Sequence, residues 1–187
     1  MMVLKFKDAN QQRKFKTLIY GLDGVGKSTA AEAYCKKREL HPVCIDLDDT
    51  NYTNVPRLDV DWKYDKDVVA GMRNIIADIQ KDEYFDTLII DGCGTLSNIL
   101  LPPIKESQRA YLLRTQNFKK IWKCLLNSNI NVVFIGQKDL IVTEDNDSSK
   151  FAEMINNMVD WKFRCYRDGM NFKSECTKWR REKEELY

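Results

Sequence analysis

A run of glycines beside a lysine and a serine is the stretch of this 187-residue chain whose spacing most directly predicts chemistry. Residues 21–28 read Gly-Leu-Asp-Gly-Val-Gly-Lys-Ser and fit the pattern G-x-x-x-x-G-K-[ST] in full. Glycines let successive backbone amides point inward at phosphate oxygens, and a following helix adds partial positive charge. Lys27 can reach the β- and γ-phosphates, and the Ser28 hydroxyl can ligate Mg²⁺. The predicted phosphate site comprises Gly21, Leu22, Asp23, Gly24, Val25, Gly26, Lys27, Ser28 and Thr29.

An apolar run that ends in an acid is the natural partner of this loop. Residues 85–91 read Phe-Asp-Thr-Leu-Ile-Ile-Asp, which is typical of a buried strand followed by a carboxylate. In phosphate-loop proteins an acid at this place holds the metal, directly or through water. We therefore predict a metal site made of Ser28 and Asp91.

Alternating strands and helices must position these groups. Apolar, β-rich runs predict strands over 16–20, 42–47, 87–90 and 130–135. Helical spacing of apolar residues, or a run without breakers, predicts helices over 26–40, 65–81, 106–127 and 148–158, the last with Ser148 as its cap. Residues 161–166 and 171–179 flank Asp168-Gly169, which is a hairpin signal.

This order of elements predicts an α/β fold. Strands that alternate with helices, mostly as continuous apolar runs, indicate a parallel sheet with helices on both faces. The terminal hairpin would add antiparallel strands at one edge. Because the sequence contains no internal repeat and no Pro/Gly/Ser linker, we expect residues 1–187 to form a single domain.

Composition narrows the classes of function. The chain is 43% hydrophobic and 31% charged, which is typical of a globular protein. Its one histidine, His41, argues against a Ser-His-Asp hydrolase and against a histidine metal site. The six cysteines form no CxxC pair, no apolar run nears membrane-spanning length, and the first residues lack a signal peptide's apolar core. We expect a reduced, cytoplasmic protein.

Charge is unevenly placed along the chain. The net charge is +2, and that total alone gives no indication of nucleic-acid binding. Residues 1–20 and 161–187 are nevertheless basic, whereas 138–160 is acidic. Contact with nucleic-acid phosphates, which needs Lys and Arg, is therefore expected at the two ends of the chain if it occurs.

Several families share the phosphate loop. The loop is similar to that of thymidylate-kinase-like enzymes, but the chain has no Asp-Arg-Tyr motif and no Arg-rich lid. Residues 134–139 echo the Asn-Lys-x-Asp motif of GTPases, but no residue separates Lys138 from Asp139. A kinase of the first type and a nucleotide-gated binding protein with little turnover remain alternatives.

More of the chain, from about residue 16 to 181, resembles the RecA/RadA-like ATPases, especially the small single-domain phage proteins of the Sak type. Residues 44–49 resemble the family's second strand, with Asp48 at the position of the acid that activates water and Asp49 beside it. Residues 132–137 resemble the strand whose terminal glutamine, here Gln137, senses the γ-phosphate. Lys178-Trp-Arg180 is similar to the Lys-x-Arg motif that reaches a neighbouring subunit's ATP.

The resemblance implies a three-layer P-loop NTPase fold of RecA-like type, with ATP and Mg²⁺ as cofactors. It implies that five residues, Lys27, Asp48, Gln137, Lys178 and Arg180, act in catalysis. It also implies a homo-oligomeric ring or filament, contact with single-stranded DNA, and a role in phage DNA recombination or single-strand annealing in the host cytoplasm. Hydrolysis would be slow without assembly or DNA.

The family's polymerisation tether, Phe-x-x-Ala, has a match in Phe6-Lys-Asp-Ala9. We therefore expect residues 1–15 to be a tether or an edge strand, and 182–187 to be a charged tail. In this family, loops after the metal-acid strand and after the glutamine strand meet DNA. Here those loops, 94–106 and 138–149, contain few bases, so DNA contact is expected from the basic ends or from an assembled ring.

Overall fold

The computed structural model describes residues 14–50, 52–102, 108–137, 154–180 and 186. Its centre is a seven-stranded sheet with the strand order β3-β2-β4-β5-β1-β6-β7. The strands are β1 (Lys16–Gly21), β2 (Pro42–Asp46), β3 (Arg57–Leu58), β4 (Thr87–Asp91), β5 (Asn131–Gln137), β6 (Trp161–Asp168) and β7 (Asn171–Trp179). All neighbouring strands pair in parallel except β6 and β7. The predicted α/β fold with a mostly parallel sheet and a C-terminal hairpin is confirmed.

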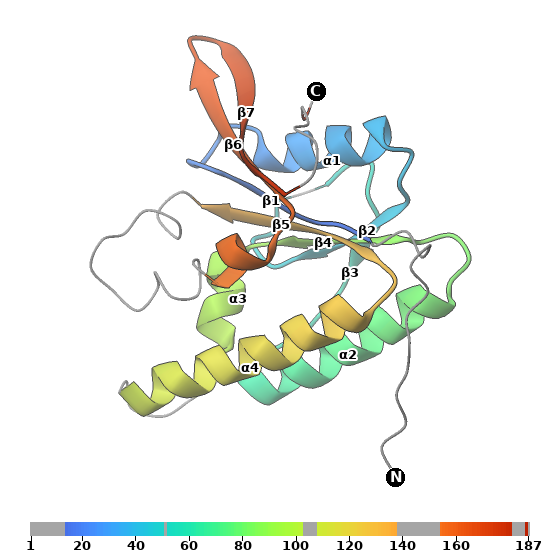
Figure 1. Cartoon of the computed structure of the whole chain (residues 1–187), viewed down its shortest axis with the longest axis vertical. Helices are drawn as coiled ribbons and strands as arrows, with labels where there is room; N and C mark the ends of the chain where they lie inside the picture. Colours follow the sequence, from blue (N-terminus) through green and yellow to red (C-terminus); the bar gives the residue numbers. More distant parts are fainter. Residues whose placement is uncertain (1–13, 51, 103–107, 138–153, 181–185, 187) are drawn as a thin grey trace.

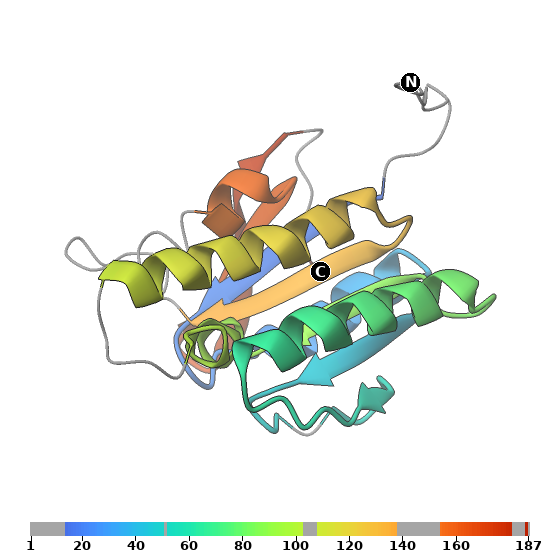
Figure 2. The same cartoon turned by 90° about the horizontal axis from the view of Figure 1, so that it is seen from below.

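Helices cover both faces of the sheet and complete three layers (Figure 1). The helices are α1 (Lys27–Lys37), α2 (Asp65–Lys81), α3 (Cys93–Ile99) and α4 (Gln108–Asn127), and residues 154–158 are also helical. Helix α1 lies on one face, while α2 and α4 run side by side along the other (Figures 1 and 2).

Strands β1, β2, β4 and β5 each contribute to two hydrophobic cores because successive side chains point to opposite faces. In β1, Ile19 packs in the cluster that contains Tyr34 of α1. Its neighbour Leu18 packs in the other cluster, with Met72 of α2 and Phe118 of α4. All five side chains are at most 2% exposed, so β1 is fixed between both helical layers.

The parallel register brings several strand ends to one edge. Gly21 at the end of β1 lies opposite Gln137 of β5 and Cys165 of β6. Asp91 at the end of β4 lies opposite Asp46 of β2. Strand β5 lies between β1 and β4, so its last residue separates the glycine loop from the strand that ends in Asp91.

Some elements differ from the sequence expectations. Helix α3 occupies the first part of the stretch 94–106 that was expected to be a loop, because Gly92 is the N-cap of a new helix, with a φ of +94° that glycine adopts readily. The two-residue strand β3 was not predicted. Helix α1 ends at Lys37 rather than at residue 40.

The terminal hairpin was expected to add antiparallel strands, but β6 extends the parallel sheet beside β1 and only β7 is antiparallel. Its turn is centred on Gly169 and Met170 rather than on Asp168-Gly169, because Asp168 and Asn171 still pair.

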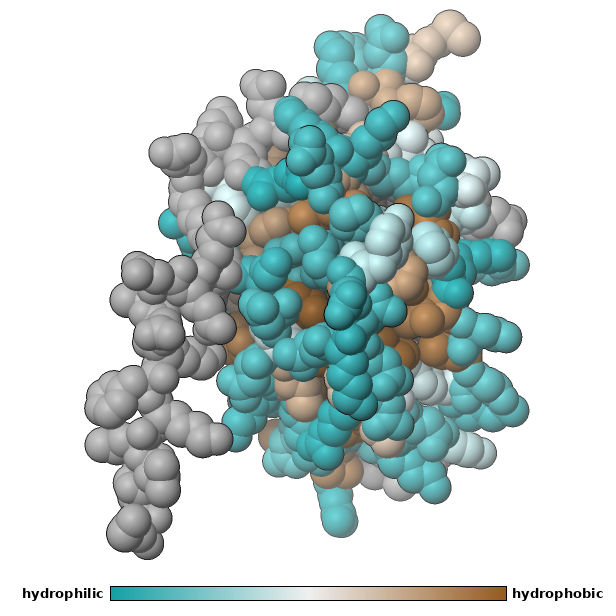
Figure 3. All heavy atoms as spheres, turned by 90° about the vertical axis from the view of Figure 1, so that its right-hand side faces the viewer, coloured by the Kyte–Doolittle hydropathy of each residue, from teal (hydrophilic) through white to brown (hydrophobic). Residues whose placement is uncertain are grey.

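Several expectations lie outside the described residues. These are the tether match at residues 6–9, most of the segment 1–15, the first part of the helix 148–158 with its cap Ser148, the loop 138–149, and most of the tail 182–187. Among the helices that the structure does describe, none combines the length and the apolar character needed to cross a membrane. Figure 3 shows one face of the molecule, which is mainly hydrophilic with hydrophobic residues exposed between the polar ones.

Candidate nucleotide-binding site

The glycine loop joins β1 directly to α1. Gly24 and Gly26 have φ values of +69° and +78°, which L-residues with side chains rarely adopt, so the curl of the loop depends on these glycines. Helix α1 begins where the amide of Ala30 donates to the Gly26 carbonyl at 2.9 Å. The Lys27 ammonium donates to the Leu22 carbonyl at 2.8 Å, so the side chain folds back across the loop. The helix N-terminus, the loop amides and this lysine thus converge as an anion site requires.

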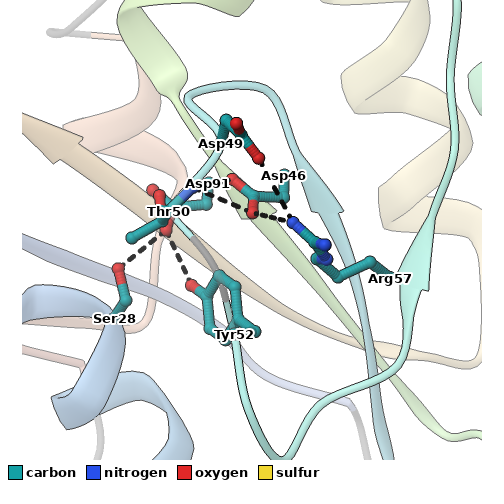
Figure 4. A network of polar contacts seen from close by, with 7 residues as sticks. All are labelled: Ser28, Asp46, Asp49, Thr50, Tyr52, Arg57 and Asp91. Atoms are coloured by element: carbon teal, nitrogen blue, oxygen red, sulfur yellow. Dashed lines mark hydrogen bonds and ion pairs between the residues drawn. The ribbon is translucent and has the colours of Figure 1, made fainter.

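The predicted metal ligands are in contact. The hydroxyl of Ser28 donates to Oδ2 of Asp91 at 2.8 Å, although the residues are 63 positions apart in the chain (Figure 4). Asp91 is 4% exposed, and burial raises the pKa of its carboxyl group while hydrogen bonds from hydroxyl groups oppose that rise. A serine oxygen beside a carboxylate is a hard-oxygen set that suits Mg²⁺, which typically binds one or two protein oxygens, substrate phosphates and water.

Tyr52 completes the surroundings of the buried acid. Its hydroxyl donates to the same Oδ2 atom of Asp91 at 2.7 Å (Figure 4). Burial, and then the nearby Asp91 charge, raise the pKa of the Tyr52 hydroxyl, so it remains a protonated donor. No sequence pattern indicates this contact, because Tyr52 lies in the connection between β2 and β3, which has no hydrophobic periodicity.

Three acids at the end of β2 and in the turn after it, Asp46, Asp48 and Asp49, have different partners. Asp46 accepts the amide of Thr50 at 3.0 Å, and its carboxylate also contacts Arg57 at 3.4 Å (Figure 4). Asp49, with a φ of +50°, pairs with the same guanidinium at 3.3 Å. Asp48 instead accepts a hydrogen bond from the Thr95 hydroxyl of α3 and lines a cavity. Thr95, which also lines the cavity, is a functional candidate that the sequence analysis missed.

Gln137 lies beside the glycine loop. Its side-chain amide donates to Oδ1 of Asp23 at 3.1 Å. Because β5 separates β1 from β4, the glutamine is adjacent to the loop on the side that faces Asp91. The structure therefore brings together the glycine loop, Asp48, Asp91 and Gln137, as the sequence analysis expected for one site.

Lys178 and Arg180 lie elsewhere. Lys178 pairs with Lys162, which lies opposite Leu18 near the beginning of β1, so these cations are at the edge remote from the loop. Their side chains donate to the carbonyl groups of Asn156 and Asn157 at the end of the short helix 154–158. Within one chain, the structure does not bring them to the glycine loop.

A cavity of about 1040 Å³ connects the grouped residues. It is lined by residues of the glycine loop and of the start of α1, by the end of β5, and by Phe172 of β7. The residues that line it at or after the ends of β2 and β4 are Asp48, Thr50, Tyr52, Thr53, Asn54, Asp91, Cys93, Gly94, Thr95 and Asn98. Asp23, Glu32, Asp48 and Asp91 line it, and Lys27 is the single cation among its lining residues in the described part of the chain. Bound phosphates would therefore need a metal ion to offset the surrounding carboxylates.

Comparison with known families agrees with this geometry. A family model described as an AAA domain matches residues 13–168, which is most of the chain. The chain belongs to this AAA domain family. The match covers the glycine loop, Asp91 and Gln137, and indicates a P-loop NTPase-type domain that binds nucleotide. No curated protein matches the chain.

Proposed function

We propose that this AAA domain protein is a RecA-like ATPase of the small phage type, which binds ATP with Mg²⁺ and acts in DNA recombination or single-strand annealing. The observation that carries this proposal is the place of β5 between β1 and β4. Because Gln137 ends β5, it lies between the glycine loop and Asp91, and this position supports a role in sensing the γ-phosphate. We further propose that residues 1–187 act as one cytoplasmic domain.

The positions of the site residues suggest separate roles in binding the phosphates, holding the metal ion and sensing the γ-phosphate. The loop amides and Lys27 bind and neutralise the phosphates, and Ser28 and Asp91 would hold the metal ion. That ion supplies charge neutralisation at the bridging phosphate oxygens. Gln137, which bonds to Asp23 of the loop, links the state of the γ-phosphate to β5.

Asp48, rather than Asp49, is the acid proposed to orient or deprotonate the attacking water. Asp49 is paired with Arg57 at 3.3 Å and does not line the cavity. Asp48 lines it and is held by the Thr95 hydroxyl. The contact from α3 fixes the direction of a side chain that is one methylene shorter than the glutamate usual in the resembled family.

Lys178 and Arg180 are proposed to serve the site of a neighbouring subunit in a ring or filament. Their distance from the loop of their own chain leaves contact with another copy as the route to phosphate. A cation supplied in trans contributes on the order of 10³–10⁵ in rate, so the isolated protein should be slow. Single-stranded DNA is the proposed partner of the assembled form.

The test is ATP hydrolysis measured with and without single-stranded DNA, together with light scattering for mass. Lys27→Ala should lower turnover by about 100-fold or more, because it removes a charge that stabilises the transition state. Lys36→Ala, an exposed position on the same helix, is the matched control and should have wild-type turnover.

Four results would contradict parts of this proposal. Equal turnover of Lys27→Ala and Lys36→Ala would refute the phosphate-loop assignment. A strict monomer with no response to DNA would refute the recombinase role. Transfer of phosphate from ATP to a nucleoside monophosphate would instead favour a kinase. Tight nucleotide binding without hydrolysis under all conditions would favour a nucleotide-gated binding protein.

A further inference from the structure

The strand order indicates how a bound nucleotide would be oriented across the sheet. Asp48 follows β2, Asp91 ends β4, Gln137 ends β5, and the glycine loop follows β1. The groups suited to the metal, the water and the γ-phosphate therefore lie on the β2–β5 side of the loop. The remainder of a nucleotide has to extend the other way, toward β6 and β7. From β4 to β6 the sheet spans three strand spacings, which is about 14 Å.

Among the described residues that line the cavity, one aromatic side chain, Phe172, comes from the β6–β7 hairpin. Phe172 of β7 lines the cavity and is 49% exposed. Its ring contacts the loop so closely that a β-carbon on Gly26 would lie 3.1 Å from Cδ1 of the ring. Tyr52 also lines the cavity, but its hydroxyl donates a hydrogen bond to Asp91, one of the two predicted metal ligands. Among the described residues that line the cavity, Phe172 is thus the ring available to an aromatic ligand group beyond the phosphates.

The hairpin fixes the place of this ring. Arg167 of β6 lies directly opposite Phe172, and its guanidinium is 4.7 Å from the ring centroid. Such a cation–π contact favours one orientation of both groups. The strands join through only Gly169 and Met170, and Figure 1 shows the hairpin on the same side of the sheet as α1. The ring is therefore presented by a short, paired element rather than by a long loop.

The cavity also has polar lining residues. The amide of Asn54 donates to Glu32 of α1 at 3.1 Å, and both residues line the cavity. Thr29, at the start of α1, lines the cavity as well. An aromatic ring together with amide, carboxylate and hydroxyl groups in one cavity suits a heterocycle with flat apolar faces and a hydrogen-bonding edge.

We propose that Phe172 forms one wall of a nucleobase subsite, so that a nucleoside triphosphate lies across the strand ends with its γ-phosphate toward β4 and its base against the β6–β7 hairpin. This inference rests on the proposed nucleotide-binding function and adds to it a residue that determines how the base is held. The ring binds the base through its face or edge, and Arg167 holds the ring.

The experiment compares two ligands by calorimetric titration in the presence of Mg²⁺. ATP has a base and inorganic tripolyphosphate has none, so the two separate base contacts from phosphate contacts. Phe172→Ala should weaken ATP binding about 5- to 150-fold, the range found for loss of one stacking ring. Its affinity for tripolyphosphate should equal that of the wild type. Phe172→Trp should restore ATP affinity to within a few-fold of the wild-type value.

Met170→Ala is the matched control, since Met170 is 97% exposed at the same hairpin tip and does not line the cavity. It should bind both ligands as the wild type does. The subsite would be refuted if Phe172→Ala bound ATP with unchanged affinity, or if it lost affinity for ATP and tripolyphosphate equally. If the wild type and Lys27→Ala both failed to bind either ligand, the proposed function itself would be overturned, and the subsite with it.

Discussion

Gly92 offers the most direct test of how the edge of the sheet that carries the candidate site is built. It follows Asp91, caps α3, and has a φ of +94°. A β-carbon at this position would lie 2.7 Å from Oδ1 of Asp48 and 3.0 Å from the β-carbon of Leu47. Gly92→Ala therefore adds backbone strain of about 1–2 kcal/mol for a left-handed residue. It also displaces Asp48 from the Thr95 hydroxyl, at about 1 kcal/mol for the hydrogen bond.

The expected loss in the free energy of unfolding is thus about 2–3 kcal/mol, measured by urea denaturation. Gly169→Ala is the matched control, because Gly169 has a φ of +61° and nothing within 4 Å of its β-carbon position. That variant should lose only the strain contribution. ATP turnover should fall in Gly92→Ala, where Asp48 is displaced, and should be unchanged in Gly169→Ala.

A double-mutant cycle isolates the contact between the two residues. In an Asp48→Ala background the carboxylate is gone, so Gly92→Ala should cost about 1 kcal/mol less than it does in the wild type. Equal losses for Gly92→Ala and Gly169→Ala, together with zero coupling to Asp48→Ala, would show that Asp48 does not lie against the start of α3. The proposed orientation of this acid would then be wrong.

Three further predictions concern stability. Arg57→Ala should lower the free energy of unfolding by about 1–2 kcal/mol, because the Asp46 side chain is 3% exposed and loses its cation. As a control, Arg164→Ala breaks a half-exposed ion pair with Glu175 and should lower it by at most about 1 kcal/mol. Equal losses in the two variants would contradict the role of burial. Phe118→Ala should cost about 3–5 kcal/mol in the same urea assay, since the ring is fully buried, and a loss below about 1 kcal/mol would contradict its place in the core. Burial raises the pKa of the Cys35 thiol from 9.0 to about 12, so its stabilising contribution is complete below pH 9 and is lost as the pH rises toward 12. Cys35→Ala should therefore flatten the fall in unfolding free energy over that interval, and an unchanged pH profile would refute the assignment.

The parts of the fold that sequence reasoning predicted are those that repeat a physical pattern. Helix α2 has the predicted bounds, 65–81, because its apolar side chains return at helical spacing to one buried face. The four predicted strands exist because each is a continuous apolar run covered on both faces. The glycine loop was recognisable because the curl of its backbone requires glycine at fixed positions.

The rest could not be predicted because it depends on contacts between distant segments. Helix α3 has a mixed composition with a glycine inside it, and its start depends on Gly92 adopting a left-handed conformation beside Asp48. The contacts of Tyr52 with Asp91 and of Thr95 with Asp48 join segments that are 39 and 47 residues apart. No pattern within a short stretch of sequence predicts contacts between such distant residues. They arise only once the parallel sheet brings the ends of β2 and β4 together.

The cations at the remote edge have a consequence for any assembly. Lys178 and Arg180 donate to the last carbonyl groups of the helix 154–158, which would otherwise lack hydrogen-bond partners. An ammonium or guanidinium turned toward a neighbour's phosphate gives up that contact. In the proposed assembly, a subunit whose Lys178 or Arg180 contacted a neighbour's ATP would therefore lose a hydrogen bond at the end of this helix. A change at the helix end would then show that the contact between subunits had formed.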